Sequence, residues 1–299
     1  MKFSVIIPTY KRIEFLEKAI ESINIQTYHN YEIIVVNDNP DDKIRIDNLC
    51  TKFDKITVIH SSHTKGGNAA RNLGILKSEG ELIAFLDDDD LWLPEKLERH
   101  LEAHKQYPDA GLIFSDCLYI YNSSLITDNA TCYSVPADVI EAMGKAKFCP
   151  ATTSMVSIRR KCIEKCGLFD EKLVSFQDWD YWFRIAHKFK FIHIPMILVH
   201  FRQHLRGRTS QNEERRLKGL KQICNKWEKE IEVKIFSRYW IRSMYHKNSL
   251  NALLAGDKTA AFKKSLRLLN TEVISIPSIK SFISLSLHLF IKKNSKIDL

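Results

Sequence analysis

Four aspartates stand in a row at Asp87–Asp90, directly after the apolar run Leu82–Leu86. Each pair of neighbouring carboxylates repels, at a cost of roughly 1 kcal/mol at 4 Å in water and more at a protein surface. A divalent cation removes that cost. Two such carboxylates can hold Mg²⁺ or Mn²⁺ and still leave coordination positions for phosphate oxygens and water. We therefore interpret the cluster as a metal site, with a solvated acidic loop as the alternative.

The backbone decides where each carboxylate points. If the extended chain continues past Leu86, Asp87 and Asp89 lie on one face and Asp88 and Asp90 on the other, because alternate side chains of a strand point to opposite sides. On this basis Asp87 and Asp89 are the expected ligands. Asp90 is expected to hold the first backbone N–H groups of the helix that follows.

A glycine-containing loop, KGGNAARNLG, precedes and opens another predicted helix at Lys65–Gly74. The glycines Gly66 and Gly67 allow the backbone to approach a ligand, and the N-terminus of the helix favours an anion. Arg71 is expected to pair with a phosphate or with a neighbouring carboxylate. A plain surface turn is the alternative interpretation of this loop.

Asp38 follows the apolar run Tyr31–Val36. A carboxylate at that point can accept a hydrogen bond from the N–H of a pyrimidine or from a ribose hydroxyl. A turn-forming aspartate, assisted by Asn39 and Pro40, is the alternative.

These segments require a scaffold that brings them together. Through the first 120 residues, continuous apolar runs, typical of strands buried on both faces, alternate with apolar residues at helical spacing. This alternation predicts an α/β fold with a mostly parallel, Rossmann-like sheet flanked by helices. The predicted strands are Phe3–Ile7, Tyr31–Val36, Ile56–His60, Leu82–Leu86 and Gly111–Tyr121, and the predicted helices are Phe15–Ile23, Ala69–Lys77 and Pro94–Gln106.

The same fold predicts where a ligand binds. In open parallel sheets, ligands occupy the crevice at the carboxyl ends of the strands. Pro8–Arg12, Asp38 and the four aspartates each follow a predicted strand. We therefore expect all three segments to converge on one edge of the sheet.

The composition limits the kinds of partner and the cellular location that we expect. The chain has 299 residues and a formal net charge of +9, which suggests an anionic partner such as a phosphorylated molecule, nucleic acid or an acidic membrane. Its seven cysteines form no CxxC pair. The N-terminal apolar run is too short for a signal peptide, and no run approaches the roughly 20 apolar residues that span a bilayer. We expect a reducing, cytoplasmic location.

Taken together, the motifs resemble the glycosyltransferase family 2 enzymes, which have the GT-A nucleotide-diphospho-sugar fold. The resemblance covers about residues 3 to 205. It rests on SVIIPTYKRIEF, EIIVVNDNPDD, GGNAARNLGI, LIAFLDDDDLW and SFQDWDYWFRIA. The chain departs from the family at Asn37, where the nucleoside-binding block has Asp, at Asn39-Pro40, where it has Gly-Ser, and at Gln177, where Glu is usual.

The resemblance implies an inverting transfer from a nucleotide-diphosphate sugar. From the family, UDP is the expected nucleotide and Mn²⁺ or Mg²⁺ the expected cofactor. The expected acceptor is a glycan or a lipid-linked hydroxyl, in capsule, O-antigen or other bacterial surface polysaccharide synthesis. Asp87 and Asp89 match the Asp-x-Asp metal motif. The residues expected to bind the donor are Pro8, Thr9, Tyr10, Arg12, Asp38, Arg71, Asp87, Asp88, His204, Arg206 and Arg208.

Asp178 matches the family's catalytic base, the carboxylate that takes the proton of the attacking hydroxyl. Asp180 is the competing candidate, or a helix-capping residue. Trp179 and Asp180 are expected to bind the acceptor. The segment His200–Ser210 resembles the family's loop over the diphosphate, so His204 is a further candidate metal ligand, and a basic surface loop is the alternative.

We expect a catalytic domain at residues 1–210, with a nucleotide-sugar half at 1–120 and an acceptor half at 121–210. A helical region is expected at 211–299. The tail after Asn270 combines apolar residues with Lys280, Lys292 and Lys293, which predicts peripheral contact with an anionic membrane on its cytoplasmic side or, alternatively, packing on the domain or on a second subunit.

Two other functions are alternatives to the transferase. A sugar nucleotidyltransferase would need a glycine- and arginine-rich loop after the first strand, and the sequence has none there. A nucleic-acid-binding protein would fit the positive charge, but the sequence has no recognised basic-aromatic module, and the acidic cluster would repel phosphate without a metal. No nucleic-acid partner is therefore expected.

Overall fold

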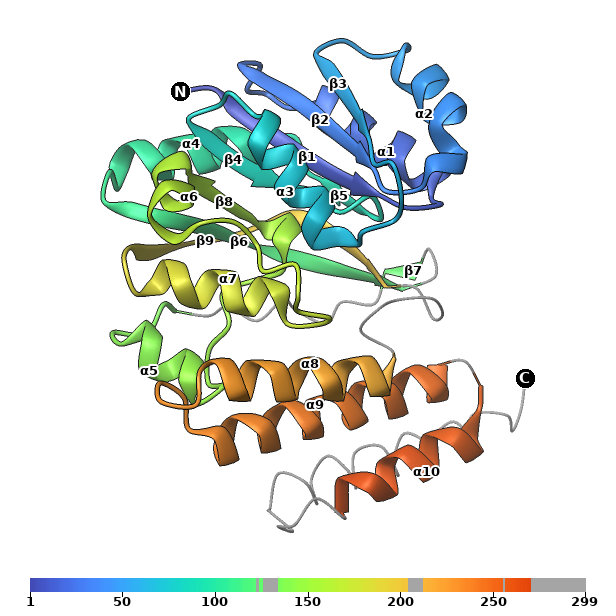
Figure 1. Cartoon of the computed structure of the whole chain (residues 1–299), viewed down its shortest axis with the longest axis vertical. Coiled ribbons are helices and arrows are strands. Elements are labelled where there is room, and N and C mark those ends of the chain that lie inside the picture. The colour runs from blue at the N-terminus through green and yellow to red at the C-terminus, as the bar shows by residue number, and fades with distance from the viewer. Residues whose placement is uncertain (122–123, 126–133, 204–211, 255, 270–299) are drawn as a thin grey trace, which may run out of the picture. The chain divides into compact units, whose positions relative to one another are not determined.

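The structure is a computed structural model that describes residues 1–121, 124–125, 134–203, 212–254 and 256–269. Within these residues, nine strands form one sheet in the order β3-β2-β1-β4-β8-β6-β9-β5, with β7 paired to β6 (Figure 1). The strands are β1 Phe3–Thr9, β2 Tyr31–Asn37, β3 Ile56–His60, β4 Leu82–Phe85, β5 Asp90–Trp92, β6 Ala110–Tyr121, β7 Ser124–Leu125, β8 Val156–Arg159 and β9 Lys190–Gln203.

The directions of the strands confirm the expected α/β fold. The first four strands pair in parallel, and β6 also pairs in parallel with β9. Strand β8 runs antiparallel to both β4 and β6, so β6 and β9 point the same way as the first four strands. Strand β5 pairs antiparallel with β9, and β7 pairs antiparallel with β6.

Helices cover both faces of this sheet, which explains why its central strands are apolar without alternation. The helices up to Gln203 are α1 Ile13–Asn24, α2 Lys43–Cys50, α3 Gly67–Lys77, α4 Lys96–Gln106, α5 Val139–Gly144, α6 Arg160–Cys166 and α7 Gln177–Ala186, with short 3₁₀ turns η1 at Pro40–Asp42 and η2 at Thr153–Met155; those that pack on the sheet include α1, α2, α3, α4 and α7. On one face, residues of α1, α2 and α4 pack with Val5 and Ile7 in a single core. On the other face, α3 packs on Ile6 and α7 packs on Phe85.

The fourth helix begins later than the sequence predicted. Helix α4 starts at Lys96 rather than at Pro94. The three residues before it form a turn that is tied to other elements: Leu93 donates its N–H to the carbonyl of Leu198, and the carbonyl of Pro94 accepts from the N–H of Thr27. Those bonds fix the chain in a non-helical path up to Glu95.

The chain divides into two compact units. The first unit comprises Met1–Met143 and Phe148–Gln203, and the second comprises Gly144–Lys147 together with the described residues after Gln203. The second unit contains α8 Glu213–Lys226, α9 Val233–Leu254 and α10 Lys258–Leu269. Glu213 joins these helices, because its carboxylate accepts from Asn248 of α9 and pairs with Lys264 and Arg267 of α10.

Among the residues described, no helix combines the length and the apolar character needed to cross a membrane.

Gly80 sets the start of β4, the strand that leads to the four aspartates. Its N–H donates to the hydroxyl of Ser4 at 2.8 Å, and its carbonyl accepts from Arg160 at 2.7 Å. A Cβ at this position would lie 2.6 Å from the backbone nitrogen of Ser4 and 2.7 Å from the carbonyl oxygen of Lys2. The strand can therefore lie this close to β1 only because residue 80 has no side chain.

The substitution Gly80→Ala is expected to lower the free energy of unfolding by about 1–3 kcal/mol, because the new methyl group must displace backbone atoms. Urea unfolding followed by circular dichroism measures the change. Glu81→Ala, at a neighbouring side chain that is 64% exposed, is the control and should have little effect. Equal stability of the two variants would contradict this account of the close approach.

Candidate functional site

The four aspartates occupy a turn, not a continued strand. Strand β4 ends at Phe85, the chain turns at Asp88 and Asp89, and β5 begins at Asp90. The expected alternation of the four carboxylates between two faces is therefore wrong. Asp87, Asp89 and Asp90 can each offer an oxygen such that the three oxygens lie within 4.8 Å of one another.

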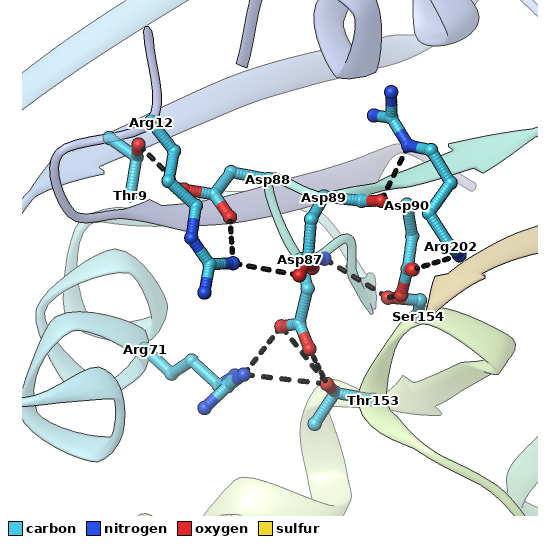
Figure 2. A network of polar contacts seen from close by, with 10 residues as sticks. All are labelled: Thr9, Arg12, Arg71, Asp87, Asp88, Asp89, Asp90, Thr153, Ser154 and Arg202. Atoms are coloured by element: carbon cyan, nitrogen blue, oxygen red, sulfur yellow. Dashed lines mark hydrogen bonds and ion pairs between the residues drawn. The ribbon is translucent and has the colours of Figure 1, made fainter. Parts of the chain in front are cut away.

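Asp88 points away from that group of three. Its carboxylate accepts from the hydroxyl of Thr9 at 2.9 Å and lies 3.2 Å from the guanidinium of Arg12, as Figure 2 shows. Burial raises the pKa of Asp88 to about 7, although Arg12 opposes this shift. The same guanidinium nitrogen of Arg12 lies 2.7 Å from Asp89. Arg12 thus places positive charge between two adjacent carboxylates.

Arg71 provides positive charge on the opposite side of the turn. Its guanidinium pairs with Asp87 at 2.5 Å, so the structure contains the carboxylate partner that the sequence left open (Figure 2). The hydroxyl of Thr153 also lies 3.2 Å from each oxygen of Asp87. Arg71 comes from α3 and Thr153 from η2, so two separate elements orient one carboxylate.

Ser154 connects the two ends of the acidic turn. Its hydroxyl donates to Asp90 at 2.6 Å and accepts from the backbone N–H of Asp87 at 3.0 Å. Asp90 also accepts from the backbone N–H of Arg202 in β9. Helix α4 begins without a side-chain cap, so the expected capping role of Asp90 is wrong. Its hydrogen bonds place it in the carboxylate cluster instead.

Sequence reasoning missed the roles of Thr153, Ser154 and Arg202. Thr153 and Ser154 lie in the run CPATTSM, where consecutive hydroxyl residues were the available signal. Arg202 donates from its side chain to the carbonyl of Asp89 at 2.6 Å, and its guanidinium lies over the ring of Phe15. The link between Arg202 and Asp89 depends on β9 pairing with β5, which periodicity does not reveal.

The other residues expected to bind the donor lie near the same edge of the sheet. Pro8 and Thr9 end β1, and Tyr10 follows in an exposed turn. Asp38 follows β2 and donates its N–H to the carbonyl of Thr9. Its carboxylate accepts the backbone N–H groups of Lys65 and Gly66 at 2.9 and 2.7 Å, which closes the glycine loop against the sheet. The contact of Asp38 with a nucleoside stays a prediction.

Asp178 lies in the first turn of α7 and is half-buried. Its carboxylate accepts the backbone N–H of Trp179 at 2.8 Å. Phe176, two residues before Asp178, is the N-cap residue of the helix and has a left-handed backbone with a φ of 62°. This conformation costs a non-glycine residue roughly 1–2 kcal/mol and turns the chain sharply into α7.

The segment that leads to α7 is held by two asparagines of α3. The side-chain amide of Asn72 exchanges two hydrogen bonds with the backbone of Phe169, each at 2.9 Å. The amide of Asn68 donates to the carbonyl of Asp170 at 2.8 Å. Helix α3 therefore holds both Asp87, through Arg71, and the chain that leads to Asp178.

The expected acceptor contacts of Trp179 and Asp180 are corrected by their burial. Trp179 is 1% exposed and stacks on Phe183, with ring centroids 4.7 Å apart. Asp180 is fully buried and pairs with Arg184 at 3.1 Å. Neither side chain has the surface that an acceptor contact requires, and the ion pair with Arg184 replaces the capping role that was the alternative for Asp180.

Three predicted donor-binding residues, His204, Arg206 and Arg208, lie outside the described residues, as does the tail after Leu269.

Comparison with known proteins gives a family. The sequence profile of "Glycosyl transferase family 2" matches residues 4–164. An uncharacterized glycosyltransferase of Bacillus subtilis, YwdF, is 31% identical over 203 residues, which cover 67% of this chain and 73% of that protein. An uncharacterized glycosyltransferase of Rickettsia felis is 43% identical over 119 residues, which cover 40% of this chain but only 19% of that protein.

Solved structures share the fold. TarS 1–349 of S. aureus, in complex with UDP-GlcNAc, has a TM-score of 0.60 at 15% identity and covers 95% of this chain and 79% of its own. The mannosyltransferase PcManGT of Pyrobaculum calidifontis, in complex with GDP-Man and Mn²⁺, has a TM-score of 0.60 at 16% identity and covers 97% and 80%. The GT-A fold expected from the sequence is confirmed. With the profile match and the YwdF relative, the chain belongs to glycosyl transferase family 2.

Proposed function

We propose that this protein transfers a sugar from a nucleoside diphosphate sugar to an acceptor hydroxyl, with a divalent cation bound at the acidic turn. The observation that carries the proposal is the cluster of Asp87, Asp89 and Asp90 at the carboxyl end of β4. Its donor atoms are all carboxylate oxygens, the ligands that Mg²⁺ and Mn²⁺ prefer. Family membership supports the same reaction.

The residues of the turn suit a diphosphate leaving group. When bound, the cation stabilises the charge that develops on the departing diphosphate. Arg71 and Thr153 fix the direction of the Asp87 carboxylate, and Arg12 fixes that of Asp89. Because these partners orient the carboxylates within the folded chain, the cluster pays little reorganisation cost when it receives the cation and the phosphates.

Asp178 is the proposed base. It lies in the first turn of α7, where the partial positive charge of the helix N-terminus favours the carboxylate form. A carboxylate there can take the proton of the acceptor hydroxyl while the hydroxyl oxygen attacks the anomeric carbon. Attack from the side opposite the leaving diphosphate inverts the configuration of the sugar.

The proposed donor is a UDP-sugar and the proposed acceptor is a glycan or a lipid-linked hydroxyl in surface polysaccharide synthesis. TarS in complex with UDP-GlcNAc supports uridine, whereas PcManGT in complex with GDP-Man and Mn²⁺ shows that the fold also serves guanosine. We assign catalysis to residues 1–210. Residues 211–299 are assigned a supporting role, including a cytoplasmic, peripheral contact with the membrane that carries the acceptor.

Asp87→Asn and Asp89→Asn are each expected to abolish transfer and the Mn²⁺-dependent part of nucleotide binding, because each removes a charged ligand. Thermal stabilisation by UDP, GDP and their sugars, with and without Mn²⁺, measures the binding. The control is Asp54→Asn, which removes the same charge from an exposed position before β3. Retention of wild-type turnover in both aspartate variants would refute the metal assignment.

Asp178→Asn is expected to keep donor binding but to lose transfer by about 10²- to 10⁴-fold, the usual contribution of a general base. Single-turnover transfer from a labelled nucleotide sugar measures the loss. The matched control is Asp180→Asn in the same helical turn, which should lower stability because it breaks the buried pair with Arg184. If Asp178→Asn is active and Asp180→Asn binds donor without transfer, the two roles are exchanged.

The full chain is expected to float with vesicles that contain anionic lipid and to remain soluble with neutral vesicles. The reason is the mixture of apolar residues and lysines after Asn270, together with the exposed Tyr239 of α9 and Phe262 of α10. A chain that ends at Asn270 is the comparison. Equal soluble recovery of both chains with anionic vesicles would rule out the membrane contact.

A further inference from the structure

Three basic side chains lie buried in a row on α4. Lys96, His100 and His104 are spaced four residues apart, so they share one face of the helix. Each is at most 1% exposed. Hydrogen bonds join them: the amine of Lys96 lies 2.6 Å from Nε2 of His100, Nδ1 of His100 lies 2.7 Å from the hydroxyl of Ser157, and that hydroxyl lies 2.9 Å from Nε2 of His104.

The chain of bonds ends at a backbone carbonyl. The amine of Lys96 donates to the carbonyl of Met155 at 2.8 Å and lies 3.3 Å from the hydroxyl of Ser115. Met155 is the last residue of η2. The preceding carbonyl, that of Ser154, accepts from the indole of Trp92 at 2.8 Å. Lys96 and Trp92 therefore hold two consecutive carbonyls of one short turn.

The surroundings of Lys96, His100 and His104 favour the uncharged form of each side chain. Among the described residues, the ion pairs found include no carboxylate partner for Lys96, His100 or His104. The other titratable groups that act on them are Cys117 and Arg159. Burial raises the pKa of Cys117 to about 12, so it supplies no negative charge, and Arg159 is a cation. Burial lowers the pKa of Lys96 and of His100 well below their ordinary values and that of His104 to about 3.

The distances allow two orders of protons along the row. If the amine of Lys96 is neutral and accepts from His100, the N–H of each histidine is on Nε2, and the bonds run from His104 through Ser157 and His100 to the amine. If the amine donates to His100, as an ammonium must, both histidines carry the proton on Nδ1 and the bonds run the other way. Nδ1 of His104 is buried and has no hydrogen-bond partner within the described chain. The charged order would leave a buried N–H unsatisfied there, which is rarer than an unsatisfied acceptor, and would bury an ammonium without a carboxylate.

The turn that Lys96 holds is the one that orients the acidic cluster. Thr153 contacts both oxygens of Asp87, and Ser154 joins Asp90 to the backbone of Asp87. We propose that Lys96 is a positioning residue: as a neutral amine it fixes the η2 turn, and through Thr153 and Ser154 it sets the placement of the carboxylates of Asp87 and Asp90. The consequence for cation binding rests on the proposed function, but the order of protons and the placement of the turn do not.

The first test reads the protons directly in the wild-type protein. Nitrogen-15 NMR of the imidazoles distinguishes the two neutral tautomers. At pH 7, His100 and His104 are both expected to be neutral with the N–H on Nε2. A proton on Nδ1 of both rings, or an ordinary titration of either ring near pH 6.5, would overturn the order of protons in which the neutral amine accepts from His100.

The second test compares variants of the same buried row. Lys96→Met keeps the length of the side chain but removes its hydrogen bonds. Lys96→Gln is neutral, with one donor for Met155 and one acceptor for His100. His104→Leu removes a buried polar group at the far end of the row and is the control. In Lys96→Met, but not in His104→Leu, the backbone amide resonance of Asp87 is expected to shift, because that amide donates to Ser154. Lys96→Gln should restore most of the wild-type position.

The same variants should differ in cation binding. Direct hydrogen-bond partners of metal ligands typically contribute 10- to 100-fold to affinity. Lys96 acts on such partners, Thr153 and Ser154, so Lys96→Met should raise the half-saturating Mn²⁺ concentration for stabilisation by UDP by up to about that factor. The positioning role would be overturned if Lys96→Met and His104→Leu changed the amide resonance of Asp87 equally and also changed the Mn²⁺ requirement equally. If the wild type binds UDP without any effect of Mn²⁺, the proposed function fails, and the Asp87 resonance still decides the role of Lys96.

Discussion

The mutual repulsion of four adjacent carboxylates is the constraint on which the site depends. A continued strand would place these charges in two facing pairs with no partner in the chain. Instead the backbone turns at Asp88 and Asp89, which separates Asp88 from the other three. Arg12 then lies between Asp88 and Asp89, and Arg71 pairs with Asp87. Burial raises the pKa of Asp88 to about 7, although Arg12 opposes the shift, so this carboxylate is costly to keep charged.

The rest of the fold supplies the partners from distant parts of the chain. Arg12 follows β1, Arg71 belongs to α3, and Thr153 and Ser154 form η2. Parallel pairing of β1 with β4 brings Thr9 within 2.9 Å of Asp88, and pairing of β5 with β9 brings Arg202 to Asp90. Close packing is part of this arrangement, since Gly80 allows β4 to lie against β1 without a side chain between them.

Much of this scaffold was predictable from the sequence. Strands buried on both faces appear as continuous apolar runs, and helices appear through their spacing, so Phe3–Ile7, Tyr31–Val36 and Ile56–His60 fall within the observed strands. The carboxyl-end rule then places the aspartates correctly at the sheet edge. The turn at Asp88 escaped prediction because identical adjacent residues contain no periodic signal that distinguishes a turn from an extended chain.

The wrong expectations at α7 and the missed contacts of η2 have a different cause. In α7 the consecutive residues Trp179–Phe183 are all buried, so helical spacing could not separate core side chains from exposed ones. Asp180 is buried there with Arg184, one turn later, as an ion-pair partner. The contacts of Thr153, Ser154 and Lys96 depend on elements that meet only in the folded chain. The sequence shows the hydroxyls and the lysine but not what they touch.

The central claim is that the acidic turn holds the cation and the diphosphate together. Anomalous diffraction at the manganese edge, from crystals soaked with MnCl₂ and UDP, tests it most directly. The strongest anomalous peak is expected between the carboxylates of Asp87, Asp89 and Asp90, with oxygens of the diphosphate bound to the same ion. A diphosphate bound with no manganese at these carboxylates, or manganese bound only elsewhere, would contradict it.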